Sequence, residues 1–139
     1  MSMSAYGQTP RVESINVVEY GIYTTTTESE RAAKDTPGGA IKSTTNIRHA
    51  LTTRDIPAQL GLEFGFRFDV IGTPTGARVP VHVVAIFPAP GLYDTASKQR
   101  FPKAEYDRID AIGRGGYLSY TFEQDWEQIP GVWTFQLWN

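Results

Sequence analysis

Three acidic residues near the carboxyl end of the chain are the side chains best placed to do chemistry. Glu123, Asp125 and Glu127 alternate with other residues, so on a β-strand they would point to one side at intervals of about 7 Å. Carboxylates in such a row could bind a hard cation such as Ca²⁺, or supply the acid and the base of a hydrolase. The opposite side of the same segment is apolar, and polar outer faces are usual on sandwich strands. The row is therefore better explained as a solvated outer face.

The other reactive side chains form no recognisable catalytic or metal-binding set. The chain has no cysteine, which excludes disulfides, thiolate nucleophiles and cysteine-based metal sites. Its two histidines, His49 and His82, each lie in an expected strand with no carboxylate or second histidine at ligand spacing. The glycine cluster at residues 113–116 lacks the Lys-Ser/Thr of a phosphate-binding loop and is better explained as a turn. We therefore expect no catalytic residue, no metal and no cofactor.

The composition is that of a folded domain without a strongly charged partner. A length of 139 residues fits one domain, and a charged fraction of 20% argues against disorder. The net charge is −2 and no basic cluster occurs, so we expect no nucleic acid and no membrane as partners. The longest apolar stretch, residues 83–90, is too short to span a bilayer. No signal peptide is recognisable, which together with the lack of cysteine predicts a cytoplasmic protein.

Alternation of apolar residues by twos predicts the main elements. Residues 12–27 are predicted to form a strand whose apolar phase changes at the adjacent Val17 and Val18, as at a β-bulge or where a strand passes between sheets. The clearest alternation covers residues 60–71, and a β-branched run follows at 79–87 after a turn-rich segment. We expect these two strands to pair as a β-hairpin.

Other segments carry weaker signals. Residues 28–40 are predicted to be a polar connection with at most one helical turn, at 29–34. The stretch 88–116 has no clear periodicity, and a short helix over 102–112 or an irregular loop would fit it. Pro80 suits an edge strand or the start of a strand, because it lacks a backbone N–H. Further strands are expected at residues 43–53, 116–127 and 132–138.

The closing strand, residues 132–138, follows a Pro-Gly turn and is unusually aromatic. Trp133, Phe135 and Leu137 share one phase and are expected in the core. Trp138 lies on the opposite phase, where an exposed ring could anchor a partner.

Aromatic residues in the 88–116 stretch form a second candidate binding surface. Tyr93, Phe101 and Tyr106 lie among polar neighbours, and exposed rings on a sandwich suit carbohydrate stacking. Long loops of compact domains often carry function. The alternative, that these rings cover an open end of the core, is favoured.

Roughly six or seven strands without a convincing long helix predict an antiparallel sandwich or barrel. Each strand has one apolar face and one mixed face, the pattern of two sheets packed face to face. We expect a single domain over residues 12–139, preceded by a flexible segment over residues 1–11.

Four segments together resemble one bacterial family, the domain of unknown function numbered 3859. They are VVEYGIY (17–23), LGLEFGFRF (60–68), FPAPGL (87–92) and YTFEQDWEQIPGVWTFQLW (120–138). The resemblance implies an all-β, immunoglobulin-like sandwich of about seven strands, and it supplies no active-site residues. Members of the family usually continue through a turn into one more strand. Because this sequence stops at Asn139, we expect the final strand to be missing and residues 132–138 to be an edge strand.

These observations favour a non-catalytic module that binds another protein. An exposed apolar edge recruits further strands, so we expect the 132–138 strand to pair with a second copy, with another protein or with the chain's own amino-terminal segment. A homodimer is the simplest form of this pairing. A carbohydrate-binding module that uses Tyr93, Phe101 and Tyr106 is the first alternative. A hydrolase that uses the acidic row is the second.

Overall fold

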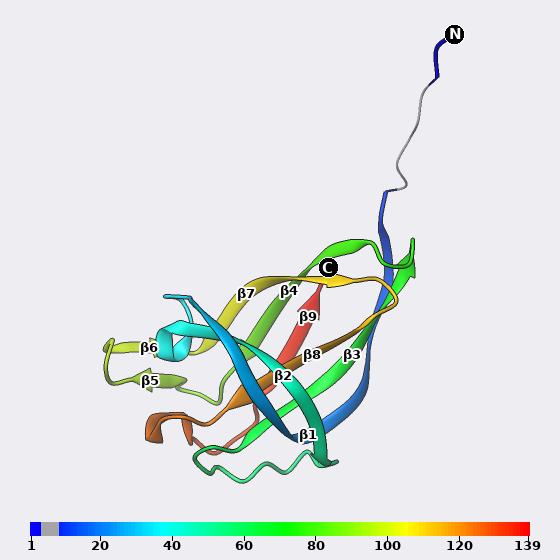
Figure 1. Ribbon diagram of the computed structural model, residues 1–139. Helices are drawn as coiled ribbons and strands as arrows, with labels where there is room; N and C mark the ends of the chain where they lie inside the picture. The colour runs from blue at the N-terminus through cyan, green and yellow to red at the C-terminus, as the bar shows by residue number, and fades with distance from the viewer. Residues whose placement is uncertain (4–8) are drawn as a thin grey trace.

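The computed structural model describes residues 1–3 and 9–139 and is built almost entirely from strands (Figure 1). Part of the expected flexible segment 1–11, residues 4–8, lies outside the described residues. The strands are β1 (Arg11–Ala32), β2 (Ala40–Leu51), β3 (Glu63–Thr73), β4 (Arg78–Ile86), β5 (Leu92–Asp94), β6 (Gln99–Phe101), β7 (Lys103–Ala111), β8 (Gly115–Thr121) and β9 (Thr134–Trp138). The described residues also form two short 3-10 turns, η1 (Pro37–Gly39) and η2 (Asp125–Glu127). Within the described residues, no helix is long and apolar enough to cross a bilayer.

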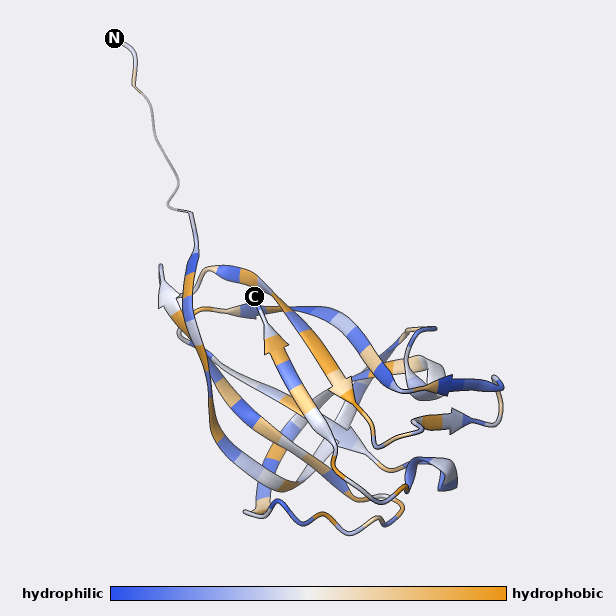
Figure 2. Ribbon diagram, turned by 180° about the vertical axis from the view of Figure 1, so that it is seen from behind, coloured by the Kyte–Doolittle hydropathy of each residue, from blue (hydrophilic) through white to orange (hydrophobic). Residues whose placement is uncertain are grey.

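Seven of the strands form two antiparallel sheets. The first sheet has the order β2-β1-β3-β8 and the second has the order β7-β4-β9, while β5 and β6 pair in a separate hairpin. The predicted all-β sandwich of about seven strands is confirmed, because apolar residues of both sheets meet in shared core clusters. Figure 2 shows the underlying alternation, with hydrophobic and hydrophilic residues following each other along the strands.

The first strand contains the predicted irregularity at its adjacent valines. Val17 pairs with Phe68 and Glu19 pairs with Arg67, so Val18 is an extra residue without a partner in β3. A β-bulge of this kind reverses the side-chain phase, which is the phase change seen in the sequence. The strand stays in one sheet across the bulge, so the bulge and not a change of sheet is the explanation.

Beyond Tyr23, β1 leaves β3 and continues with β2 as a two-stranded ribbon, residues 24–48, which we call the arm. Its tip is η1. Figure 1 shows the arm passing over β8 toward the β5–β6 hairpin. On the way, Arg31 Nη2 donates to the Asp107 carbonyl of β7 at 3.1 Å. The predicted helical turn at 29–34 is wrong, because β1 extends to Ala32 and cross-strand pairing within the arm holds it extended.

The expected hairpin between residues 60–71 and 79–87 is also wrong. β3 pairs with β1 and β8, whereas β4 pairs with β7 and β9. The turn between them carries the chain from one sheet to the other, so that Val70 and Val79 meet in the same core cluster. Two consecutive amphipathic strands can either pair edge to edge or pack face to face, and alternation alone does not distinguish these arrangements.

The segment 102–112 is a strand and not a helix or a loop. In β7, burial alternates as a strand requires: four residues are buried or half-buried, Ala104, Tyr106, Arg108 and Asp110, and the residues between them are exposed. Two of these four residues are charged, which hides the period of two in the sequence. They are accommodated because Arg108 and Asp110 form a bidentate pair, with N···O distances of 2.8 and 2.9 Å.

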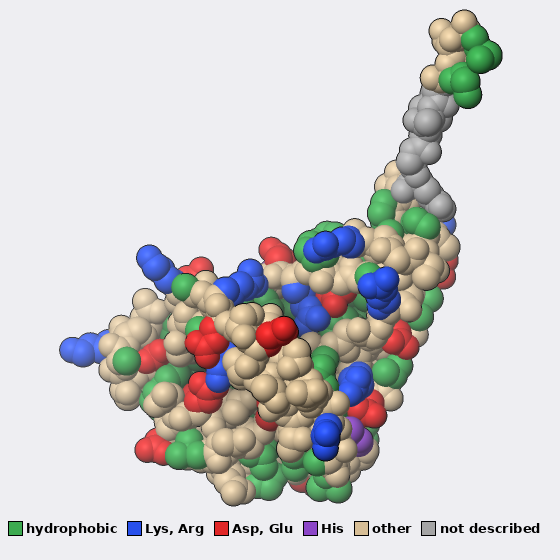
Figure 3. Space-filling view, in the orientation of Figure 1, with side chains coloured by type: hydrophobic (Ala, Val, Ile, Leu, Met, Phe, Trp, Pro, Cys, Tyr) green, Lys and Arg blue, Asp and Glu red, His purple; other side chains and the backbone are tan. Residues whose placement is uncertain are grey.

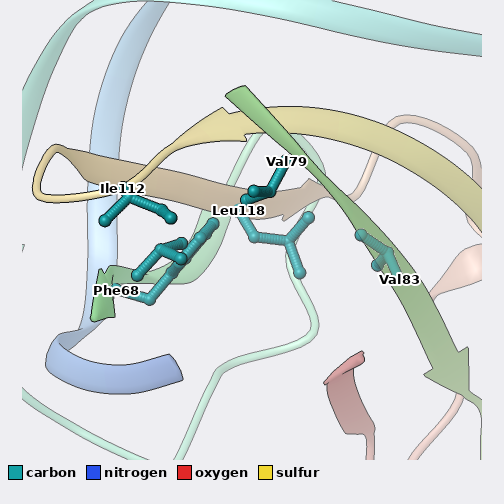
Figure 4. Packing of buried hydrophobic residues seen from close by; sticks show 6 residues of the cluster. Phe68, Val79, Val83, Ile112 and Leu118 are labelled. Carbon is teal, nitrogen blue, oxygen red and sulfur yellow. The ribbon is translucent and has the colours of Figure 1, made fainter. Parts of the chain in front are cut away.

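The core consists of two adjoining clusters. The first gathers Phe68, Val70, Val79, Val83, Ile112 and Leu118 (Figure 4). The second gathers Ala85, Phe87, Leu92, Phe101 and Ala104. Trp133 packs against the second cluster, Leu137 against the first, and Phe135 against both, so the predicted inward phase of the closing strand is confirmed.

Candidate interaction surface

The structure does not form the acidic row expected at residues 123–127. β8 ends at Thr121, and Asp125 and Glu127 belong to η2. Glu127 is 5% exposed and accepts hydrogen bonds from the Tyr120 hydroxyl and from the Gln124 N–H, the latter at 3.0 Å. Glu123 instead pairs with Lys42 of the arm. The prediction of one shared strand face is therefore wrong, because the chain turns before the row begins.

Glu127 titrates in an unusual environment for a carboxylate. Burial raises the pKa of this carboxyl, while the hydrogen bonds from Tyr120 and Gln124 oppose the shift only in part. Burial and the neighbouring Glu127 carboxylate raise the pKa of the Tyr120 hydroxyl as well. Among the described residues, no group of three or more His, Cys, Asp or Glu side chains could hold a metal ion.

We expect Glu127→Gln to remove a pH-dependent loss of stability. Because the folded pKa lies above the unfolded value of 4.5, this carboxyl contributes stability below that pH, and the contribution is lost as pH rises through the folded pKa. Between about pH 4.5 and neutral pH, the free energy of unfolding of the variant should therefore rise progressively relative to that of wild type. Denaturant unfolding at a series of pH values measures this difference. Glu13→Gln, at an exposed position of β1, is the matched control. A difference that stays constant with pH would contradict the assignment.

The three aromatic residues proposed for carbohydrate stacking do not lie on one surface. Phe101 is 8% exposed and belongs to the second core cluster, and Tyr106 is half-buried against the first. Tyr93 is 41% exposed, and the Arg100 guanidinium carbon lies 5.2 Å from its ring centre. Phe101 and Tyr106 therefore serve mainly in packing.

The edge of β9 differs from the other sheet edges of the described chain. Of the strands in residues 1–3 and 9–139, β9 pairs with β4 alone. No charged residue occurs between residues 128 and 139. By contrast, the edge strands β2 and β7 carry several charged side chains, and Arg108 Nη1 donates to the Tyr117 carbonyl of the fourth edge strand, β8, at 2.7 Å. Charges and covering groups are the usual protection of sheet edges, and among the described residues nothing of either kind protects β9.

Pro80 fits β4 because it lies beyond the part that β9 covers. The β4–β9 pairing begins at His82, so the missing N–H of Pro80 leaves no gap in that ladder. Asn139 Nδ2 donates to the Pro80 carbonyl at 3.0 Å. This bond also shows that the backbone carbonyl of Pro80 points to the β9 side of β4.

The direction of the backbone groups in β9 follows from this bond. Successive residues of a strand point their N–H and C=O to opposite sides, so His82, Val84 and Ile86 face β9. The N–H of Phe87 donates to the Pro102 carbonyl at 3.0 Å, on the opposite side of the strand, which agrees with this alternation. The β9 partners of the three residues are Trp138, Gln136 and Thr134. The backbone groups of Phe135 and Leu137 therefore point outward from the edge.

An apolar groove lies beside this edge, between the two sheets. Its volume is about 750 Å³, and its walls come from β1, β3, β9, the segment 53–58 and the turn at 129–133. Aromatic rings line much of it: Tyr20, Phe64, Phe66, Phe122, Trp133 and Phe135. The rings of Phe64 and Phe135 meet edge to face, with centroids 5.9 Å apart. Trp138 is 57% exposed on the outer face of the same sheet.

A second hollow, of about 860 Å³, lies between the arm and strands β7 and β8. Its lining is polar, and its charges are largely paired with one another. Arg67 Nε donates to Glu19 Oε1 at 3.0 Å, and Arg108 pairs with Asp110. Figure 3 shows basic and acidic side chains interspersed over this face of the molecule. The sequence gives no signal for this hollow, because it exists only where the arm crosses the sheet.

Two antiparallel sheets packed face to face, with a sheet-to-sheet crossover between β3 and β4, define an immunoglobulin-like β-sandwich. The chain belongs to the family described as domain of unknown function DUF3859, whose model matches residues 11–139. Its fold is similar to the crystal structure of an immunoglobulin-like protein from Pseudomonas aeruginosa. The two are 21% identical, with a TM-score of 0.59 over 94% of this chain and 86% of the other. The sequence matches no curated protein.

Proposed function

We propose that this protein is a non-catalytic interaction module that binds an extended protein segment as an additional strand on β9. The observation that carries the proposal is the uncharged edge of β9 beside an aromatic groove, which no strand in the described part of the chain covers. An edge of this kind is a template for strand addition.

The edge of β9 and the aromatic groove beside it would contribute differently to binding. The outward N–H and C=O groups of Phe135 and Leu137 would supply main-chain hydrogen bonds, which give affinity for any extended segment. Alternate side chains of that segment would enter the groove over Phe66 and Trp133, which gives preference for apolar and aromatic residues.

The alternatives have less support from the described residues. Carbohydrate stacking needs rings that face solvent together, and Phe101 and Tyr106 pack against the core. A hydrolase based on acidic residues needs converging carboxylates, and Glu123 and Glu127 are held by different partners.

Peptides selected from a displayed library of random linear sequences test the proposal. In dilute protein, a bound peptide should slow hydrogen exchange of the Phe135 and Leu137 amides. The Gln136 amide, already bonded to β4, serves as the internal control. Peptides that bind without protecting the Phe135 and Leu137 amides, or a library that yields no binder, would overturn the proposal.

A further inference from the structure

We propose that the segment added to β9 is β9 of a second copy, paired antiparallel about Phe135. The inference rests on the proposed strand-accepting role of this edge and names its partner. It would join the two three-stranded sheets into one sheet with the order β7-β4-β9-β9-β4-β7. Such a pair has two-fold symmetry, in which each copy presents the same surface to the other.

The direction of the backbone groups limits the register of this pairing. Hydrogen-bonded pairs must join residues whose N–H and C=O point outward, which in β9 are Phe135 and Leu137. An antiparallel pair of identical strands meets this condition only when its two-fold axis passes through a residue, not between two residues. Axes at Thr134, Phe135 and Gln136 all satisfy it.

The burial of exposed apolar side chains distinguishes these three registers. Trp138 is 57% exposed on the outer face of β9, and Val132, which precedes β9 by two residues and borders the groove, is 81% exposed. With the axis at Phe135, and with the pairing continued two residues before β9, Val132 of each copy would lie opposite Trp138 of the other, so both apolar side chains would lose contact with water. With the axis one residue earlier or later, Trp138 would instead face Pro130 or Thr134, and Val132 would have no apolar partner. The register centred on Phe135 is therefore the best matched.

The rest of the strand is compatible with this register. Thr134 faces Gln136 of the second copy, and both can form hydrogen bonds. Phe135 faces its own counterpart on the inner side, next to the aromatic groove. No charged residue lies between 128 and 139, so no like charges are brought together across the two-fold axis.

Cysteine pairs test the register directly, because the chain has no cysteine of its own. Val132 and Trp138 are exposed, so Val132→Cys and Trp138→Cys leave the core unchanged. A mixture of the two variants should form an interchain disulfide under mild oxidation, since directly opposed residues of antiparallel strands come within disulfide reach. Each variant alone should cross-link much less. Equal cross-linking in all three samples would overturn the register.

A charge-swap experiment tests the partner. Thr134→Lys with Gln136→Lys places lysines opposite one another in the dimer, and the corresponding Glu pair places carboxylates there. By light scattering, wild type should be a dimer, and each charged variant should dissociate roughly tenfold more readily. The equimolar mixture of the two variants should recover the dimer. Thr26→Lys, at an exposed position of the arm, is the control and should leave the dimer unchanged.

The two proposals fail in different ways. A wild type that scatters as a monomer, while selected peptides still protect the Phe135 and Leu137 amides, would overturn the dimer and leave the strand-accepting function standing. A dimer that persists unchanged in both charged variants uses another surface, and would also overturn this inference. Failure of both the dimer and the peptide protection would reject β9 as a docking edge.

Discussion

Replacing Phe68 with alanine is expected to lower the free energy of unfolding by about 3–5 kcal/mol, a large fraction of the stability of a domain this size. The side chain is fully buried, at 0% exposure, in the centre of the first core cluster. The Arg108 guanidinium carbon lies 5.2 Å from its ring centre, so the ring also supports the bidentate pair of β7. The truncation leaves a cavity that rigid neighbouring strands can fill only in part.

Gly116, which lies against the Phe68 ring, provides a second test of this packing. A Cβ added at Gly116 would lie 2.4 Å from Cζ of Phe68, so Gly116→Ala alone should destabilise the protein. In the Phe68→Ala background the same methyl group enters the space that the ring has left. Denaturant unfolding of the two single variants and the double variant should therefore show a destabilisation smaller than the sum.

The control for these variants is Ile71→Ala, on the outer face of the same strand, where the side chain is 39% exposed. It should cost far less than Phe68→Ala. Strict additivity of the Phe68 and Gly116 substitutions would contradict the contact between the ring and the glycine.

Asp94→Ala is expected to cost about 2–4 kcal/mol and to loosen the tip of the arm. Asp94 is 6% exposed, and its carboxylate accepts three backbone N–H bonds. Oδ1 accepts from Ala96 and Ser97 at 2.9 and 3.2 Å, which closes the β5–β6 turn. Oδ2 accepts from Gly38 at 3.2 Å, which ties η1 to that turn. Removal of the carboxylate leaves all three donors without their acceptor.

Hydrogen exchange distinguishes local release of the arm from general loss of stability. The Gly38 amide should exchange faster in Asp94→Ala by more than the global destabilisation accounts for. Asp94→Asn, which keeps one acceptor oxygen, should fall between the alanine variant and wild type. Asp35→Ala, at an exposed position beside η1 at the tip of the arm, is the matched control. Unchanged exchange at Gly38 would show that the arm tip is held by other contacts.

The same carboxylate gives a pH dependence of opposite sign to that of Glu127. Burial alone would raise the pKa of Asp94, but the N–H groups of Ser97, Ala96 and Gly38 outweigh it and hold the pKa below its usual value of 3.8. The stability from this group is therefore present above that pH and is lost as pH falls through the folded pKa. Wild type should lose this part of its stability on acidification, whereas Asp94→Ala should not.

Several features of the fold follow from local patterns in the sequence. Alternation by twos predicts the strands around residues 60–71 and 79–87, and the change of phase at Val17 and Val18 predicts the bulge. Such patterns are readable because each strand position alternates between two faces, and only one face is buried. The inward phase of Trp133, Phe135 and Leu137 was predictable for the same reason.

The wrong predictions concern features that the alternation of apolar residues does not record. The strands at 60–71 and 79–87 belong to different sheets, because each pairs with strands distant in sequence. The strand at 103–111 was hidden because Arg108 and Asp110 neutralise each other on its less exposed side. Glu127 is buried in the turn η2, where it accepts a hydrogen bond from Tyr120 and where the adjacent Trp126 packs against the second core cluster.

The sequence by itself determined which residues of the strands at 60–71, 79–87 and 132–138 face the core, that the fold is all-β, and that the closing strand is apolar and uncharged. The tertiary structure decided which strands are neighbours, and therefore that β9 has an open edge beside an aromatic groove and that the arm crosses β8. The physical reason is that alternation records burial, a property of one strand, whereas sheet order and edges arise from contacts between segments far apart in the chain.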